Sequence, residues 1–310
     1  MPEIVVSEFM DRDAVADLAR DYDVVYEAKL VDRPNELADL VSEARALIVR
    51  NRTQVRGGLL EAAAKLEAVG RLGVGLDNID VEACKARDIA VLPATGANDL
   101  SVAEYVIAGV LVLLRGAYGA SDEVAVGAWP RERLIGREVS GRRLGLVGFG
   151  SIARETAKRA RALGMSVAAH DPFVAADDPA WRELDVVPLA LDSLLGTSDA
   201  VSLHVPLTAD TRHLIDAAAL AAMPKGPVLI NAARGGVVDE AALADALRDG
   251  RLAGAMLDVF ETEPLPDGGP LVGVPNLILT PHIAGVTEES NVRVSGVTAA
   301  NVRRVLEQRV

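Results

Sequence analysis

The chain has 310 residues, 50% of them hydrophobic and 25% charged, a composition typical of a globular protein with about two domains. Its 45 acidic and 32 basic side chains give a formal net charge of −13, and no stretch is basic enough to indicate a nucleic-acid or anionic-membrane partner. A single cysteine, Cys84, excludes an internal disulfide. The acidic start of the sequence differs from a signal peptide, and the longest apolar candidate, 102–114, contains Glu104 and is too short to cross a bilayer. We therefore expect a cytoplasmic protein.

Short apolar segments alternate with helical patterns in the first hundred residues, which predicts parallel βαβ units. Asp11 is the expected N-cap of the first helix, and Pro34 stands near the start of the second, where its missing N–H breaks no hydrogen bond. The turn residues Pro93 to Gly96 interrupt this pattern. The expected strands are 3–6, 23–26, 46–49 and 90–92, and the expected helices are 11–20, 34–43 and 59–66.

A long helix is expected over 100–115, and it is apolar on most faces, which indicates burial between layers or between subunits. A polar stretch around Trp129, Pro130 and Gly136 follows it. The alternation then resumes, so the second block is also predicted to be α/β. Its expected strands are 143–147, 166–170, 200–204, 228–231, 254–258 and 277–280, and its expected helices are 153–163 and 288–308.

Gly148, Gly150 and Ala153 follow an expected strand and open an expected helix, the setting that a G-x-G-x-x-G/A dinucleotide fingerprint requires. The first Gly permits a tight turn, the second lets a pyrophosphate approach the backbone, and the Ala keeps helix and strand close. The helix N-terminus offers free N–H groups to the phosphates. Asp171 ends the next strand, where its carboxylate can bind both ribose hydroxyls and would repel a 2′-phosphate. These residues predict NAD as the cofactor in preference to NADP.

A second G-x-G spacing, at Gly73 and Gly75, lacks the small residue and the long helix that would complete a fingerprint. Asn78 and Asp80 follow it instead. One interpretation is a plain turn, and the other is a backbone nest whose N–H groups hold a carboxylate.

Three side chains have the chemistry needed to transfer a hydride between a reduced nicotinamide and a 2-keto acid. Arg234 follows the expected strand 228–231, and its planar guanidinium suits bidentate binding of a carboxylate. His282 follows the strand 277–280, at a carboxyl-end edge of the sheet, and is the candidate proton donor. Glu263 is the candidate that orients His282 and favours its charged form.

The other three histidines have plainer interpretations. His170 flanks the expected adenosine site, His204 ends a strand, and His213 stands near the start of a surface helix. Neither an H-E-x-x-H motif nor a Cys/His cluster occurs, so no metal site is expected. The G-x-S-x-G elbow of a serine nucleophile is absent as well.

At these residues the sequence resembles the D-isomer-specific 2-hydroxyacid dehydrogenase family, over nearly the whole chain. In that family an Arg in an A-R-G-G stretch, the Glu of an E-P pair and the His of a P-H pair are catalytic, and they fall on Arg234, Glu263 and His282. The matching stretches are 70–80, 95–104, the fingerprint at Gly148, 231–239, 257–264 and 280–282.

The resemblance implies two Rossmann-like, doubly wound α/β domains with the nicotinamide in the cleft between them. A flavodoxin-like substrate domain would comprise 1–98 and 285–310, and the dinucleotide-binding domain 99–284. The helix over 100–115 would belong to the interface of a homodimer. The implied NAD contacts are Val74, Gly148, Gly150, Ser151, Ile152, Asp171, Val205, Pro206, Ala232, Ala233, Arg234, Asp258, His282 and Gly285. The implied substrate contacts are Arg50, Asn51, Arg52, Val74, Gly75, Arg234 and His282.

The loop around Arg50 and Arg52 is similar to the substrate loop of 3-phosphoglycerate dehydrogenases, with Arg52 where a small residue is more usual. The segment 129–133 is similar to one that reaches the neighbouring subunit's site in that branch. Added cations suit a second anionic group, phosphate or sulfonate, and together with the segment 7–11 they resemble sulfolactate dehydrogenases most. Alternatively, Arg52, Arg131 and Arg133 are solvated surface charges.

The sequence thus predicts an NAD-dependent oxidoreductase that interconverts a D-type 2-hydroxy acid and its 2-keto acid, with sulfolactate or 3-phosphoglycerate as the expected substrate. Two alternatives use the same scaffold. A glyoxylate or hydroxypyruvate reductase often prefers NADPH, which Asp171 disfavours. A corepressor-like protein would bind NAD without turnover.

Overall fold

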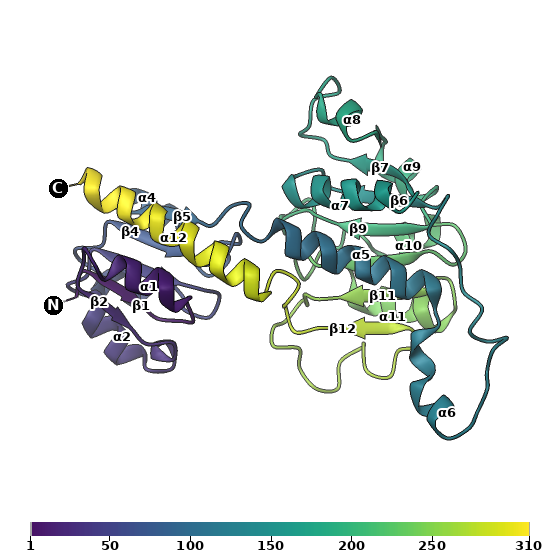
Figure 1. The fold of residues 1–310 in the computed structure, drawn as a ribbon, viewed down its shortest axis with the longest axis horizontal. Coiled ribbons are helices and arrows are strands. Elements are labelled where there is room, and N and C mark those ends of the chain that lie inside the picture. Colours follow the sequence, from purple (N-terminus) through teal and green to yellow (C-terminus); the bar gives the residue numbers. More distant parts are fainter. Residues whose placement is uncertain (1, 310) are drawn as a thin grey trace. The chain divides into compact units, whose positions relative to one another are not determined.

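A computed structural model describes residues 2–309, and they form two compact units. The first unit combines the residues up to Asn98 with those from Val286 onwards, and the second is Asp99–Gly285. Each unit is built around one parallel sheet, as the alternating pattern predicts (Figure 1). The α/β fold class predicted from the sequence is confirmed.

The sheet of the first unit has five parallel strands in the order β2-β1-β3-β4-β5. This is a doubly wound order, with helices on both faces. The strands are β1 Ile4–Val6, β2 Val24–Tyr26, β3 Ala46–Val49, β4 Ala68–Arg71 and β5 Ala90–Pro93. The helices are α1 Arg12–Leu18, the 3₁₀ helix η1 Leu30–Asp32, α2 Pro34–Val41, α3 Gly57–Ala62, α4 Val81–Ala86 and α12 Glu288–Gln308.

The C-terminal helix α12 completes the core of this first unit, although 194 residues separate it from β5. Its buried side chains, Val294, Ala299, Val302 and Leu306, pack in one cluster with residues of β1, β3 and β4. The Asp11 N–H also donates to the Ser295 hydroxyl at 3.0 Å. Residues from both ends of the described chain therefore share one hydrophobic core.

The sheet of the second unit has seven parallel strands in the order β12-β11-β10-β9-β6-β7-β8. The chain starts in the middle of the sheet at β6, winds to one side through β7 and β8, and then to the other side through β9 to β12, as in a Rossmann fold. The strands are β6 Arg143–Val147, β7 Ser166–His170, β8 Val186–Pro188, β9 Ala200–Leu203, β10 Val228–Asn231, β11 Gly254–Leu257 and β12 Leu277–Leu279. The helices are α5 Asp99–Arg115, η2 Tyr118–Ala120, α6 Ser121–Ala125, α7 Ser151–Ala162, α8 Ala180–Glu183, α9 Leu191–Leu195, α10 Ala217–Ala222 and α11 Glu240–Arg248.

Two hydrophobic clusters cover the two faces of this sheet. On one face the cluster includes residues of α5 and α7, and on the other it includes residues of α9, α10 and α11. A β-carbon at Gly109 on α5 would lie 2.8 Å from the Met256 sulfur, so this glycine lets the helix approach the sheet closely. Three strands of this sheet, β9, β10 and β11, are buried along their whole length, which explains their largely apolar sequences.

Several predicted elements have the predicted bounds, namely 46–49, 143–147, 166–170, 228–231 and 288–308. Asp11 caps α1 as predicted, with its carboxylate accepting the N–H groups of Asp13 and Ala14. Other bounds differ: the helix expected over 59–66 is Gly57–Ala62, and the strand expected over 200–204 ends at Leu203. Between the long helix and the polar stretch around Trp129, the chain also forms η2 and α6, which the prediction did not include. The prediction also missed the strands β4 and β8 and the short helices α4, α8, α9 and α10, together with the longer α11.

Among the described residues no single helix is long and apolar enough to cross a membrane. Helix α5 and the segment Tyr118–Ala125 together, bent between them, have the length and apolar composition of a membrane span. However, about half of the residues of α5, among them Val102, Val106 and Val110, are buried in the second unit.

Candidate active site

The dinucleotide fingerprint forms the turn between β6 and α7. Gly148 has φ +94°, and a β-carbon there would lie 2.5 Å from the His204 carbonyl oxygen, so only glycine fits. Gly150 is the N-cap of α7 and makes no side-chain cap. No atom lies within 4 Å of the place where its β-carbon would be. The first turn of a twelve-residue helix thus presents its N–H groups to open space, as phosphate binding requires.

Asp171 follows β7 at the same edge of the sheet. Its Oδ2 accepts the Phe149 N–H at 2.8 Å and its Oδ1 accepts the Phe173 N–H at 2.9 Å. Each oxygen keeps a lone pair free, so the carboxylate is held in place and can still accept hydrogen bonds from ribose hydroxyls. Ala153 is fully buried, which matches the small third position of the fingerprint. These residues fit a bound NAD.

His282 and Glu263 form a hydrogen-bonded pair in the second unit. The His282 Nδ1 lies 2.7 Å from the Glu263 Oε2, and the Glu263 Oε1 accepts the Phe260 N–H at 3.0 Å. Partial burial opposes ionisation of Glu263, but the hydrogen bond and charge of His282, with smaller contributions from Phe260 and Arg234, lower its pKa. The carboxylate is therefore ionised at neutral pH, and 43% of the His282 side chain is exposed to solvent.

Arg234 lies in the loop that follows β10, and Asn231 fixes this loop by accepting the Ala233 N–H at 3.1 Å and donating to the Arg234 carbonyl at 2.9 Å. A β-carbon at Gly235 would lie 1.7 Å from the Phe260 carbonyl oxygen. The Arg234 loop thus packs directly against the segment that leads to Glu263. Because β10, β11 and β12 are neighbouring parallel strands, their carboxyl ends bring Arg234, Glu263 and His282 together.

Of the residues predicted to contact NAD, all except Val74 lie in the second unit, at or after the carboxyl ends of its strands. Asp258, one of the predicted NAD contacts, has a carboxylate that is already bound within the protein. It is only 1% exposed, and both of its carboxylate oxygens accept hydrogen bonds from the protein, including the N–H groups of Ile283 and Ala284 at 2.8 Å.

The remaining histidines have structural partners. His170 Nδ1 lies 3.0 Å from the Leu189 carbonyl oxygen, and His213 Nε2 lies 3.1 Å from the Glu261 Oε1. His204 Nε2 lies 3.0 Å from the Ser202 hydroxyl, and burial lowers the pKa of His204 to about 4, so this imidazole is neutral. Within residues 2–309, no group of three His, Cys, Asp or Glu side chains is arranged to hold a metal.

The predicted substrate loop follows β3 in the first unit and is organised by Glu8, a residue of the segment 7–11 to which the sequence analysis gave no role of its own. Glu8 is 4% exposed, and its carboxylate accepts the N–H groups of Arg50, Arg52 and Thr53 at 2.9 to 3.1 Å. In the segment with the second G-x-G spacing, Gly73 lies in a bend and has φ +145°. The role of Glu8 could not be predicted from the sequence, because its three hydrogen bonds join segments more than 40 residues apart.

Arg50 and Arg52 have different partners within this loop. The Arg50 Nη2 donates to the Asn291 Oδ1 at 2.5 Å and its Nη1 to the Phe9 carbonyl at 3.4 Å, with the guanidinium 5.6 Å from the centre of the Phe9 ring. Arg52 forms an ion pair with Asp32 and is more than half exposed. Asn291, on α12, is a second contact that the sequence analysis missed.

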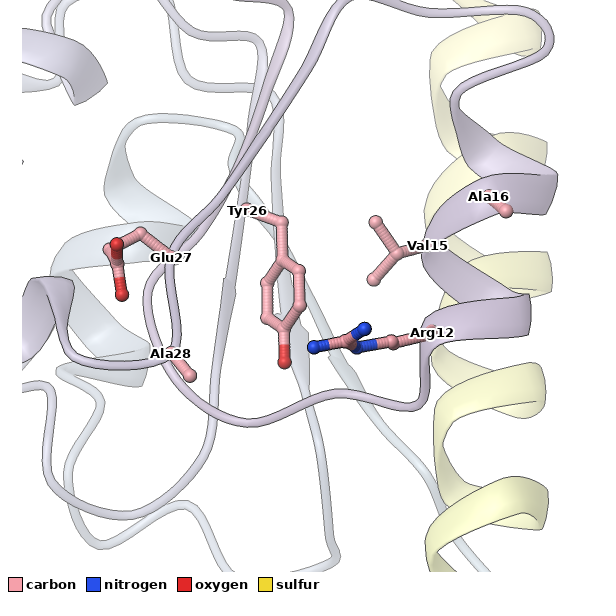
Figure 2. Close-up of a pocket in the computed structure, with 6 residues that line it drawn as sticks. All are labelled: Arg12, Val15, Ala16, Tyr26, Glu27 and Ala28. Carbon is pink, nitrogen blue, oxygen red and sulfur yellow. The ribbon is translucent and has the colours of Figure 1, made fainter.

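A hollow of about 420 Å³ in the first unit shares no residue with the predicted site. Figure 2 shows that the side chains of Arg12, Val15 and Tyr26 surround it, together with Ala16, Glu27 and Ala28. The Tyr26 hydroxyl is already used within the fold, since it donates to the Met10 carbonyl at 3.1 Å. We assign no role to this hollow.

Comparison with known proteins supports the chemistry of this site. Residues 107–284 match the family model of the D-isomer specific 2-hydroxyacid dehydrogenase NAD binding domain. A (S)-sulfolactate dehydrogenase from Chromohalobacter salexigens is 60% identical over 306 residues, 99% of each chain. A D-3-phosphoglycerate dehydrogenase from Archaeoglobus fulgidus is 38% identical over 97% of this chain, which spans 56% of that longer protein.

A solved structure of D-lactate dehydrogenase from Aquifex aeolicus, complexed with NAD and lactic acid, has a TM-score of 0.85. It is 29% identical, and the likeness covers 98% of this chain and 96% of that one. The predicted family, the NAD cofactor and the predicted enzyme class are confirmed, which favours an enzyme over the non-catalytic alternative. The chain belongs to the D-isomer specific 2-hydroxyacid dehydrogenases, NAD-dependent oxidoreductases that act on a small 2-hydroxy or 2-keto acid.

Proposed function

We propose that the protein interconverts (S)-sulfolactate and sulfopyruvate with NAD. The observation that carries this proposal is the His282–Glu263 pair beside Arg234, which supplies an acid–base group and a cation for a 2-keto acid at one edge of the sheet. The 60% identity to a sulfolactate dehydrogenase over both whole chains supports the choice of substrate.

The stereochemistry of this substrate agrees with the D-specificity of the family. In lactate the carboxylate outranks the methyl group in the naming rules, and the D-isomer is R. In sulfolactate the sulfur atom makes the sulfomethyl group outrank the carboxylate, so the same spatial arrangement is named S. (S)-Sulfolactate therefore presents its hydroxyl, carboxylate and hydrogen in the arrangement of D-lactate.

In this proposal three side chains of the second unit carry the reaction. Arg234 binds the substrate carboxylate and polarises the carbon that reacts. His282 takes the hydroxyl proton at Nε2 during oxidation and returns a proton to the carbonyl oxygen during reduction. Glu263, ionised because its pKa is lowered, holds the His282 Nδ1 and stabilises the charged imidazole. NAD, when bound, accepts the hydride from the substrate carbon.

The two units take different roles in the proposal. The second unit binds NAD through the fingerprint and Asp171, while the first unit provides substrate contacts through Arg50, Asn51, Val74 and Gly75. The dinucleotide family model matches within the second unit, which supports this division.

A substrate panel tests the proposal. We expect reduction of sulfopyruvate by NADH with a kcat/KM at least tenfold above those for pyruvate, hydroxypyruvate and 3-phosphohydroxypyruvate, measured from the loss of NADH absorbance. A higher kcat/KM for 3-phosphohydroxypyruvate would assign the protein to the phosphoglycerate reaction instead, the activity of the 38%-identical relative.

We propose that Arg50 binds the sulfonate group of the substrate and that Arg52 does not. Burial lowers the pKa of Arg50, although the charge of Glu8 opposes the shift. In the described part of the chain, the Arg50 guanidinium donates to two neutral groups, the Phe9 carbonyl and the Asn291 side-chain amide, and to no carboxylate. The charge of Arg52 is already paired with Asp32.

The Arg50→Met and Arg52→Met variants form a matched pair. We expect Arg50→Met to lower kcat/KM for sulfopyruvate about 10- to 100-fold, because one charge-assisted contact is lost, with kcat/KM for pyruvate little changed. Arg52→Met is expected to affect both substrates alike and weakly. An equal loss for sulfopyruvate and pyruvate in Arg50→Met would show that Arg50 does not contact the distal group.

A homodimer is also proposed, and the exposed apolar side chains of the segment that follows α5 support it. Val126 and Ile135 are 85% and 78% exposed, and Tyr118 and Trp129 are also mostly exposed. A hollow of about 470 Å³ lies among residues of the same segment. Apolar side chains gathered in this way are typical of a surface that a partner covers. The cytoplasmic location stays a prediction from the sequence.

A further inference from the structure

A chain of hydroxyl groups leads from helix α5 to the segment that carries His282. The Tyr105 hydroxyl, from α5, lies 2.5 Å from the Thr280 Oγ1, which directly follows β12. Thr280 in turn donates to the Asp258 Oδ1 at 2.6 Å. None of these contacts belongs to the acid–base set itself.

The direction of the chain follows from the number of protons available. The Thr280 hydroxyl has one proton, and it is directed at the Asp258 carboxylate, so its oxygen must accept the proton of Tyr105. Burial raises the pKa of Tyr105 to about 12, so this phenol keeps its proton at neutral pH. Each hydroxyl therefore donates towards Asp258.

Asp258 holds the backbone on both sides of His282. Its carbonyl oxygen accepts the His282 N–H at 2.8 Å, and its carboxylate accepts the N–H groups of Ile283 and Ala284, each at 2.8 Å. His282 has φ +54°, a left-handed conformation that is unfavourable for a residue with a side chain and persists only where its surroundings enforce it. The three hydrogen bonds to Asp258 hold His282 in this conformation.

We propose that Tyr105 and Thr280 are positioning residues that act through Asp258 to hold His282 in its left-handed conformation, facing Glu263. The hydroxyl chain fixes the carboxylate of Asp258, the carboxylate fixes the turn 282–284, and the turn sets the direction of the imidazole. This inference rests on the proposed role of His282 in proton transfer.

Substitutions in the full chain that remove one hydroxyl group each test this inference. Tyr105→Phe removes only the hydroxyl and is expected to lower kcat for sulfopyruvate reduction about 3- to 10-fold, with the KM values little changed. Thr280→Val removes the donor to Asp258 and is expected to lower kcat about 10- to 100-fold. Thr280→Ser, which keeps the hydroxyl, should restore kcat to within about twofold of the unchanged chain. Tyr22→Phe, in the first unit, makes the same chemical change and should have no effect.

The double variant Tyr105→Phe/Thr280→Val separates a chain from two independent contacts. Because Tyr105 acts only through Thr280, its loss should add nothing to the effect of Thr280→Val. If kcat of the double variant fell by the product of the two single losses, the proposal would be overturned. An unchanged kcat in both single variants would overturn it as well.

Nuclear magnetic resonance of the four histidines in the protein without cofactor gives a readout independent of turnover. The His282 signal, assigned with the His282→Gln variant, should move in Tyr105→Phe, since the imidazole is held less well against Glu263. The His170 and His213 signals should not move. A His282 signal that does not move in Tyr105→Phe would overturn the inference. If the protein without any substitution failed to reduce sulfopyruvate, that result would contradict only the proposed function.

Discussion

Replacing His282 with Gln is expected to lower kcat for sulfopyruvate reduction about 10²- to 10⁴-fold, the usual contribution of a general acid. Gln is similar in length and can still donate to the Glu263 carboxylate, so the loop should keep its shape. It cannot release a proton to the carbonyl oxygen. The measurement is the single-turnover rate of NADH oxidation at saturating substrate, with KM for NADH expected to change little.

His213→Gln is the matched control for this prediction. The protein contains a second His–Glu pair in the same unit, His213 with Glu261 at a separation of 3.1 Å, and both partners are about one-third exposed. Its replacement should leave kcat within about twofold, as is usual for a surface contact of low energy. If His213→Gln lost as much activity as His282→Gln, or if His282→Gln retained full activity, the assignment of the proton donor would be wrong.

Replacing Arg234 with Lys is expected to lower kcat/KM for every accepted 2-keto acid about 10²- to 10³-fold. The charge is kept, but the ammonium group is a point charge and cannot bind a carboxylate through two parallel hydrogen bonds. Since every substrate of this class has the 2-keto carboxylate, the loss should be similar for sulfopyruvate and pyruvate. Steady-state kinetics with both substrates checks this.

Arg248→Lys provides the control, because Arg248 ends α11 in the same unit and pairs at the surface with Asp245. It should have no effect on kcat/KM. A loss confined to sulfopyruvate in Arg234→Lys would contradict the assignment, since it would place Arg234 at the sulfonate and leave the carboxylate to another group.

The arrangement of the acid–base residues could be predicted from the sequence because a parallel sheet brings the carboxyl ends of its strands to one edge. Arg234 follows a strand whose bounds were predicted correctly, and His282 lies three residues after β12. Once both strands were assigned to one parallel sheet, the two side chains had to lie at the same edge of that sheet, with β11 between their strands. The same argument placed Gly148 and Asp171, which follow β6 and β7.

The residues that hold these groups in place could not be predicted in this way. Glu8, Asn291 and Tyr105 act through contacts with residues more than 40 positions away in the sequence. Tyr105 lies in a helix that was predicted to be apolar on most faces, and nothing in the sequence indicates that its hydroxyl meets Thr280, 175 residues away. Asp258 was recognised as a site residue, but its sequence position gave no sign that its carboxylate binds the backbone.

The short elements were missed for a different reason. The strand β4, Ala68–Arg71, has a glycine in its interior and ends on an arginine, so it lacks the continuous apolar run that predicted β3. A β-carbon at Gly70 would lie 2.8 Å from side-chain atoms of Thr298 and Val302. This glycine is therefore explained only by the helix that packs on it from the far end of the chain.

The docking of α12 on the first unit has a consequence for the order in which the polypeptide matures on the ribosome. The second unit is continuous, and its strands and helices are all present once residue 285 has left the exit tunnel. The first unit has been synthesised up to residue 98 by then, but the face of its sheet that receives Val294, Val302 and Leu306 is still bare. The nucleotide-binding half can thus fold during translation, while the half translated first must wait for the last helix before its core closes.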